Sequence, residues 1–107
     1  MRSEEIEIST GSDEVVHDLT SAVERFLEDV EGDGLLHVWV PHATAGLAIL
    51  ETGAGSDDDL LTCLLPPYAT VPVLGGVPVL GTWQSICLVD TNIDNPVRRV
   101  RFSFLAG

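Results

Sequence analysis

Alternating and helically spaced apolar residues predict the first elements of the chain. Residues 4–9 alternate polar and apolar side chains, as a short half-buried strand does. Over residues 15–30 apolar side chains recur at helical spacing and form one stripe, and Ser12 is the expected N-cap. His17 falls off this stripe, so we expect it to contact solvent. The pattern therefore predicts a strand followed by an amphipathic helix.

The rest of the chain has mostly strand character. Residues 35–40 are apolar on both faces, and 45–50 form another expected strand. Ser56, with three aspartates after it and Pro66 beyond them, indicates a short helix. Further strands are expected at 70–74, 77–80, 82–91 and 97–105, and Gly75 with Gly76 forms a hairpin turn between the first two. In the last strand the two faces separate cleanly: Val100, Phe102 and Phe104 lie on one, and Arg99, Arg101 and Ser103 lie on the other.

The expected order β-α-β-β-α-β-β-β-β predicts one α+β domain over residues 1–107, with two helices and a mainly antiparallel sheet. The strands at 35–40 and 82–91 lack a polar face. Two helices cannot cover every apolar face of such a sheet, and an exposed apolar face usually marks an interface. We therefore expect a homo-oligomer.

The charge balance changes what such a domain can bind. Seventeen acids face five bases, every base is arginine, and the net charge is −12. Nonspecific nucleic-acid binding needs a basic surface, so that class is not expected. Three arginines nevertheless cluster at Arg98, Arg99 and Arg101. They either form surface salt bridges with the many acids or attract an anion.

Localisation and cysteine use follow from the same sequence. No run of about 18 apolar residues is present, and the N-terminal residues are acidic without an apolar stretch. We expect a cytoplasmic protein that does not cross a membrane. Cys63 and Cys87 lie among apolar residues, which is typical of small buried side chains rather than of a disulfide framework or a zinc site.

Two motifs carry a resemblance to a known family. The stretch "GLLHVWVPHATAGLAILET" (34–52) is followed by "TVPVLGGVPVLGTWQSICLVD" (70–90) and by "RRVRF" (98–102). In this order they resemble a shortened member of the YjbQ-like family, whose members are usually described as secondary thiamine-phosphate synthases. The resemblance implies a homotrimeric fold with sites near subunit boundaries. It also implies a reaction that joins a pyrimidine diphosphate to a thiazole phosphate and releases pyrophosphate.

The resemblance also implies which residues form the site. His42 and Glu51 would be catalytic, and phosphorylated substrate would contact Thr44, Thr82, Gln84, Asp90, Arg98 and Arg99. Gly81 and Trp83 match the second motif as well, although Trp83 is more often a core aromatic than a stacking platform. Departure of pyrophosphate normally recruits Mg²⁺, which Glu51 or Asp90 would help to hold.

Structural interpretations compete with several of these roles. His42 is either a general acid/base or metal ligand, or a core histidine whose imidazole is satisfied by a backbone carbonyl. Glu51 would face His37 rather than His42 if residues 35–40 and 45–50 paired as a hairpin. Arg98 and Arg99 point to opposite faces of one strand, so only one of them can face a given pocket.

A noncatalytic protein that keeps the fold is the competing hypothesis. The segment "PPYATVP" (66–72) is shorter than its counterpart in the family and lacks the histidine found there. Asp90 also stands where the family more often has glutamate. Both departures weaken the transfer of function. The missing histidine favours a binding or structural trimer, whereas the retained His42, Thr44 and Gln84 favour an enzyme.

Overall fold

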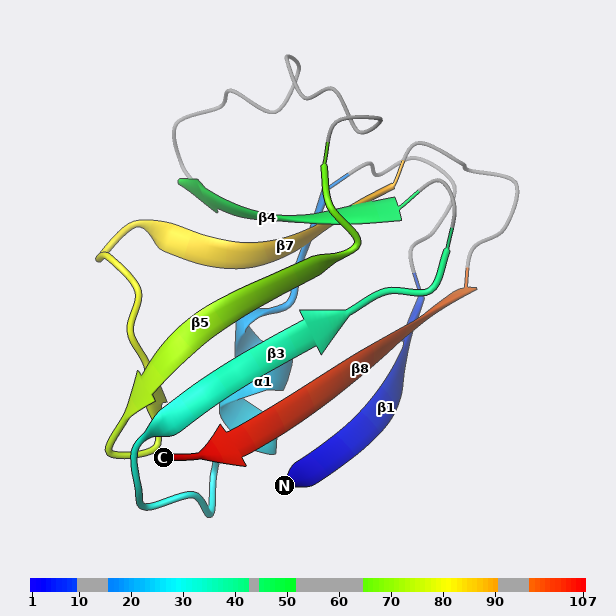
Figure 1. Cartoon of the computed structure of the whole chain (residues 1–107). Helices are drawn as coiled ribbons and strands as arrows, with labels where there is room; N and C mark the ends of the chain where they lie inside the picture. Colours follow the sequence, from blue (N-terminus) through cyan, green and yellow to red (C-terminus); the bar gives the residue numbers. More distant parts are fainter. Residues whose placement is uncertain (10–15, 43–44, 52–64, 91–96) are drawn as a thin grey trace.

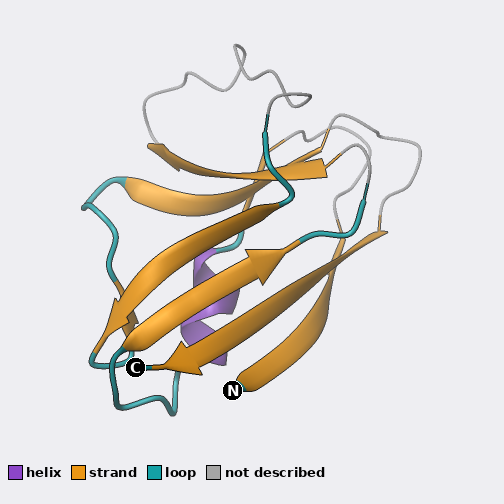
Figure 2. Ribbon diagram, in the orientation of Figure 1, coloured by secondary structure: helices purple, strands orange, loops and turns teal. Residues whose placement is uncertain are grey.

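The computed structural model describes residues 1–9, 16–42, 45–51, 65–90 and 97–107. Two antiparallel sheets and one short helix form the described part of the chain (Figure 1). The larger sheet has the strand order β1-β8-β3-β5-β6, and the smaller has the order β2-β7-β4. The helix lies behind the larger sheet. In the same view the smaller sheet lies at the upper end of the larger sheet (Figure 2).

The elements follow one another along the chain with these bounds: β1 (Arg2–Ser9), β2 (Val16–Asp18), α1 (Thr20–Phe26), β3 (Gly34–Trp39), β4 (Ala45–Glu51), β5 (Tyr68–Leu74), β6 (Val77–Pro78), β7 (Gln84–Asp90) and β8 (Val97–Ala106). One continuous core joins them. Its largest side chains come from both sheets and from the helix, for example Phe102 of β8, Leu88 of β7 and Phe26 of α1. The rings of Phe26 and Phe102 meet edge to face with centroids 5.7 Å apart.

The alternation in the last strand is confirmed. Val100, Phe102 and Phe104 are buried, whereas Arg99 and Arg101 are exposed. β8 lies between β1 and β3, so its backbone is paired on both edges. The predicted strand at residues 4–9 is confirmed as part of β1.

The predicted helix pattern is wrong. Over residues 15–30 only Thr20–Phe26 is helical, and Val16–Asp18 forms β2, which pairs with Val89–Cys87 of β7. Pairing with a strand some 70 positions away satisfies the backbone of these residues, and local periodicity cannot show this. His17 is consequently buried and not solvated as expected.

The two-helix α+β class is likewise a misassignment. The described chain is mostly antiparallel sheet with a single short helix. The expected second helix and the cap at Ser12 fall mainly on 52–64 and 10–15, which lie outside the described residues. No helix in the described ranges is long and apolar enough to cross a membrane.

The hairpin between β5 and β6 is confirmed. Gly75 and Gly76 have φ values of 59° and 79°, the left-handed conformation that a type I′ hairpin turn requires at both positions. A side chain at Gly76 would also place its Cβ 1.9 Å from the carbonyl oxygen of Val30. The turn therefore packs closely against the residues that follow α1.

β3 and β4 do not form a hairpin. β3 is the middle strand of the larger sheet, paired with β8 and β5, whereas β4 pairs with β7 in the smaller sheet. Glu51 consequently lies opposite Gln84 and not opposite His37. His37 Nδ1 and Thr70 Oγ1 are instead 3.0 Å apart across β3 and β5.

Candidate functional site

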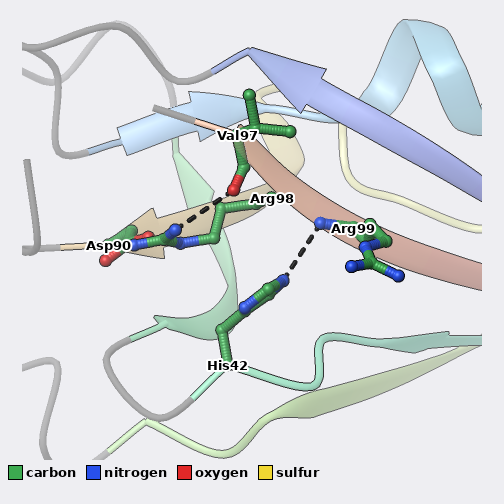
Figure 3. A network of polar contacts seen from close by, with 5 residues as sticks. All are labelled: His42, Asp90, Val97, Arg98 and Arg99. Atoms are coloured by element: carbon green, nitrogen blue, oxygen red, sulfur yellow. Dashed lines mark hydrogen bonds and ion pairs between the residues drawn. The ribbon is translucent and has the colours of Figure 1, made fainter. Parts of the chain in front are cut away.

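His42 lies just beyond the end of β3, where the chain leaves the larger sheet. The last paired residues of β3 and β8 are Trp39 and Arg101, so Arg99 lies beyond that ladder. The backbone N–H of Arg99 donates a hydrogen bond to His42 Nε2 at 3.1 Å (Figure 3). The imidazole therefore accepts a hydrogen bond from the main chain at the point where the strand pairing stops. Because Nε2 accepts, the proton of the neutral ring lies on Nδ1.

A buried ion pair lies beside this imidazole. Arg98 Nε donates to Asp90 Oδ2, and both side chains are only 2% exposed. Arg98 Nη1 also donates to the carbonyl oxygen of Val97 at 3.1 Å. Figure 3 shows this pair joining the end of β7 to the start of β8, with His42 and Arg99 next to it. Since Arg98 is buried and Arg99 is exposed, the prediction that they lie on opposite faces is confirmed.

These neighbours set the protonation of His42. Burial lowers the pKa of His42 below its usual value of 6.5, and the positive charges of Arg98 and Arg99 lower it further. The carboxylate of Asp90 opposes them by raising the pKa. The imidazole is thus neutral at pH 7 and stays neutral somewhat below pH 6.5.

Folding stability should depend on this lowered pKa. Below about pH 6.5 a histidine in the unfolded chain takes up a proton while folded His42 does not. The contribution of His42 is therefore complete above that pH and is lost as the pH falls towards its folded pKa. We expect the free energy of unfolding to fall more steeply below pH 6.5 in the wild type than in His42→Gln. An NMR titration that places His42 at or above 6.5 would contradict this expectation.

The predicted site residues separate into two groups. His42, Asp90, Arg98 and Arg99 lie together. Gln84 is at the opposite end of β7 from Asp90, which is roughly 20 Å away for a seven-residue strand. Glu51 lies opposite Gln84, so it cannot act together with His42 within one chain. Thr44 lies outside the described residues.

The second motif forms an exposed turn at the Gln84 end. The backbone N–H of Gly81 donates to Gln84 Oε1 at 2.7 Å. Trp83 is 71% exposed, so the reading of this ring as a core aromatic is wrong. Thr82 is exposed in the same turn. None of these three side chains reaches the group around His42.

The described residues do not fit the expected Mg²⁺. They contain no cluster of three His, Cys, Asp or Glu side chains suited to a metal. Asp90 is paired with Arg98, and Glu51 is at the far end of β4. We therefore assign no step to a metal ion, and its use remains a prediction.

The role of Asp90 as a counter-ion was missed, although the sequence carries a signal for it. Because side chains alternate along a strand, Arg98 lies on the same face of β8 as Val100, Phe102 and Phe104, which form its apolar face. An arginine on that face must be buried, and a buried arginine needs a carboxylate partner. Asp90 is the acid that ends the preceding apolar strand.

Comparison with known proteins supports the resemblance. The family model described as UPF0047 protein YjbQ-like matches residues 4–65. The UPF0047 protein Rv2556c of Mycobacterium tuberculosis is 47% identical over 135 positions that cover all of both chains. This chain has 107 residues, so at least 28 positions of that relative face a gap. The UPF0047 protein of Archaeoglobus fulgidus is 32% identical over 90% of this chain and 95% of its own.

Solved structures share the fold. The hypothetical protein APE1520 of Aeropyrum pernix K1 superposes with a TM-score of 0.80 at 29% identity over the full length of both chains. A YbjQ-like protein of unknown function from Sulfolobus solfataricus P2 has a TM-score of 0.81 at 24% identity, over 99% of this chain and 97% of its own. The chain therefore belongs to the YjbQ-like UPF0047 family, as a shortened member.

Proposed function

We propose that this protein is an enzyme that acts on a phosphorylated small molecule bound at Arg99 and His42. The observation that carries the proposal is the unequal state of the two neighbouring arginines. Asp90 neutralises buried Arg98. Arg99 is exposed, and among the described residues no carboxylate lies within ion-pair distance of its guanidinium. A guanidinium in this state matches the oxygens of a phosphate group.

The protonation of His42 suits the same ligand. The Arg99 N–H holds the ring through Nε2, which leaves the Nδ1 proton to donate to a phosphate oxygen. A neutral ring donates here without adding a third positive charge beside Arg98 and Arg99. Thr44 would add a hydroxyl donor from the adjoining segment. These groups bind and orient the ligand and stabilise charge on a departing phosphate.

Within this class we propose the reaction that the family resemblance implies, a thiamine-phosphate synthase-like transfer. A pyrimidine diphosphate would lose pyrophosphate as its bond to the thiazole phosphate forms. Negative charge develops on the departing pyrophosphate, which is where Arg99 and the Nδ1 proton of His42 would act. Both substrates carry phosphate, which supports this choice.

A noncatalytic phosphate-binding protein is the second candidate. Two observations favour it: the Arg99 N–H occupies the only free lone pair of the His42 ring, and the chain lacks at least 28 positions of its mycobacterial relative. Such a protein would bind pyrophosphate but would form no thiamine phosphate from the two substrates. Incubation of the protein with both substrates separates the two candidates.

We also propose that the protein assembles as a homotrimer. The outer face of the larger sheet exposes apolar side chains that lie next to one another in the strand register, Leu35 beside Leu105 and Trp39 beside Tyr68. Exposed apolar groups of this kind support a subunit interface. The trimer itself and the cytoplasmic location remain predictions.

Arg99→Ala should weaken pyrophosphate binding at least tenfold, because it removes the charged donors that face the ligand. Arg101→Ala is the matched control. Arg101 lies two residues further along the same face of β8, is also exposed, and donates to Ser3 Oγ at 2.9 Å. Titration calorimetry should show Arg101→Ala within twofold of the wild type. If the two variants lost pyrophosphate affinity equally, the arginines would act only through general surface charge, and the proposal would be wrong.

A further inference from the structure

A cavity at the other end of β7 forms a second place where a small molecule fits. Its volume is about 590 Å³, within the range of small-molecule sites. It lies between the α1 side of the molecule, the Gly75–Gly76 turn and the exposed turn before β7. Gln84 lines the cavity, whereas Asp90 of the candidate site lies at the opposite end of the same strand. The two sites are therefore separate within one chain.

The apolar part of the lining comes from residues after the helix and around β6. Leu27 is buried, and Val30 and Leu80 are half-buried, so their side chains present hydrocarbon to the cavity. Pro78 and Val77 extend this surface. An occupant gains by covering these groups with a hydrocarbon part of its own.

The charged part of the lining has one sign. Glu24 of α1 and Glu28, just beyond its end, both border the cavity, and no cationic side chain of the described residues lines it. In the described ranges the ion pairs are Arg2 with Asp29 and Arg98 with Asp90, so neither glutamate has an ion-pair partner there. Both carboxylates give this wall of the cavity a negative charge, and a bound cation would offset it. An anionic ligand such as phosphate would be repelled.

Two of the neutral polar side chains in the wall already accept hydrogen bonds. Thr20 Oγ1 accepts from the Ile86 N–H at 3.0 Å, and Gln84 Oε1 accepts from the Gly81 N–H. The carboxylates of Glu24 and Glu28 are the charged acceptors that the lining offers a ligand. An ammonium group has three donors and no acceptor, which matches them.

We propose that this cavity binds small cations with an apolar body, of the class of protonated alkylamines. The carboxylates of Glu24 and Glu28 hold the ammonium group, and Leu27, Val30 and Leu80 cover the hydrocarbon chain. This site is independent of the proposed phosphate site, so the failure of one proposal leaves the other standing.

The probe is hexylamine, titrated into the full-length protein and followed by two-dimensional NMR. Saturable binding should shift the backbone signals of Gly75, Gly81 and Gln84. Affinity should rise about two- to fourfold for each methylene from butylamine to hexylamine, because each added group buries apolar area. Hexanol, the neutral analogue, should bind at least tenfold more weakly. Absence of saturable binding, or equal affinity for hexanol and hexylamine, would overturn the proposal.

Matched charge variants test the glutamates. Glu24→Gln/Glu28→Gln should weaken hexylamine binding at least tenfold. Glu5→Gln/Glu31→Gln removes the same number of charges from exposed residues that do not line the cavity, and should stay within twofold of the wild type. All four glutamates are exposed, so both variants should keep the thermal midpoint of the wild type. Equal weakening in both would mean that net charge alone attracts the amine, which would overturn the proposal.

Discussion

Asp90→Asn should destabilise the protein more than any other single change of charge among the described residues. The Arg98 guanidinium is almost fully buried, and its ion pair with Asp90 neutralises it there. Removing one partner of a buried pair costs about 3–5 kcal/mol, because the other charge remains without compensation. For a domain of this size each kcal/mol lowers the thermal midpoint by roughly 4–8 °C. Differential scanning calorimetry at fixed protein concentration should therefore show a drop of about 12 °C or more.

Two further variants show whether burial is the cause. Asp29→Asn breaks the exposed pair with Arg2 and should leave the thermal midpoint almost unchanged. Asp90→Leu/Arg98→Met removes both charges of the buried pair and should recover most of the lost stability, since apolar replacement of such pairs is often neutral. A midpoint for Asp90→Asn no lower than that of Asp29→Asn would show that the pair does not hold β7 to β8.

The second large effect is expected at His42, where two substitutions separate the two nitrogens. His42→Gln places an amide oxygen near the position of Nε2, so it can keep the hydrogen bond from the Arg99 N–H but loses the donor at Nδ1. We expect its thermal midpoint to stay near that of the wild type. Its affinity for pyrophosphate should fall by roughly tenfold to a hundredfold, the value of one hydrogen bond to a charged group.

His42→Asn is the converse variant. Its amide nitrogen lies near the position of Nδ1, so it can keep the donor while losing the acceptor for Arg99. Its thermal midpoint should fall slightly, by the equivalent of about 1 kcal/mol, and pyrophosphate binding should be retained better than in His42→Gln. If His42→Gln kept pyrophosphate affinity and His42→Asn lost it, the acceptor at Nε2 would matter and the donor at Nδ1 would not. His42 would then have a structural role only, and the enzyme proposal would have to be abandoned.

Local signals in the sequence were sufficient to predict the elements whose conformation depends on their own residues. The Gly75–Gly76 turn needs left-handed backbone, which only glycine adopts readily, and β8 alternates strictly because one of its faces lines the core. The start of α1 was not predictable in this way. Residues 16–18 fit the apolar stripe of a helix, but they became a strand because β7 offered them a pairing edge.

The candidate site shows the same division. The alternation of β8 correctly placed Arg98 and Arg99 on opposite faces. The motif residue His42 lies beside them, and its role in a site remains a prediction. The separation of Glu51 and Gln84 from His42 follows from the pairing of β4 with β7, which depends on which sheet β4 joins. That choice is made by packing across the whole core, so motif order along the chain could not predict it.

The position of β8 in the larger sheet has a consequence for how the chain folds. β1 pairs only with β8 in the described structure, and the pairing joins Arg2 to Phe104, close to the two extremes of the sequence. Closing such a long loop costs chain entropy before any contact is gained, so high contact order should make folding slow, on the millisecond to second scale. During synthesis β1 and one edge of β3 must wait for the last strand to leave the ribosome. Until then two strand edges stay open to pairing with other chains, and that interval is the period of greatest aggregation risk for this protein.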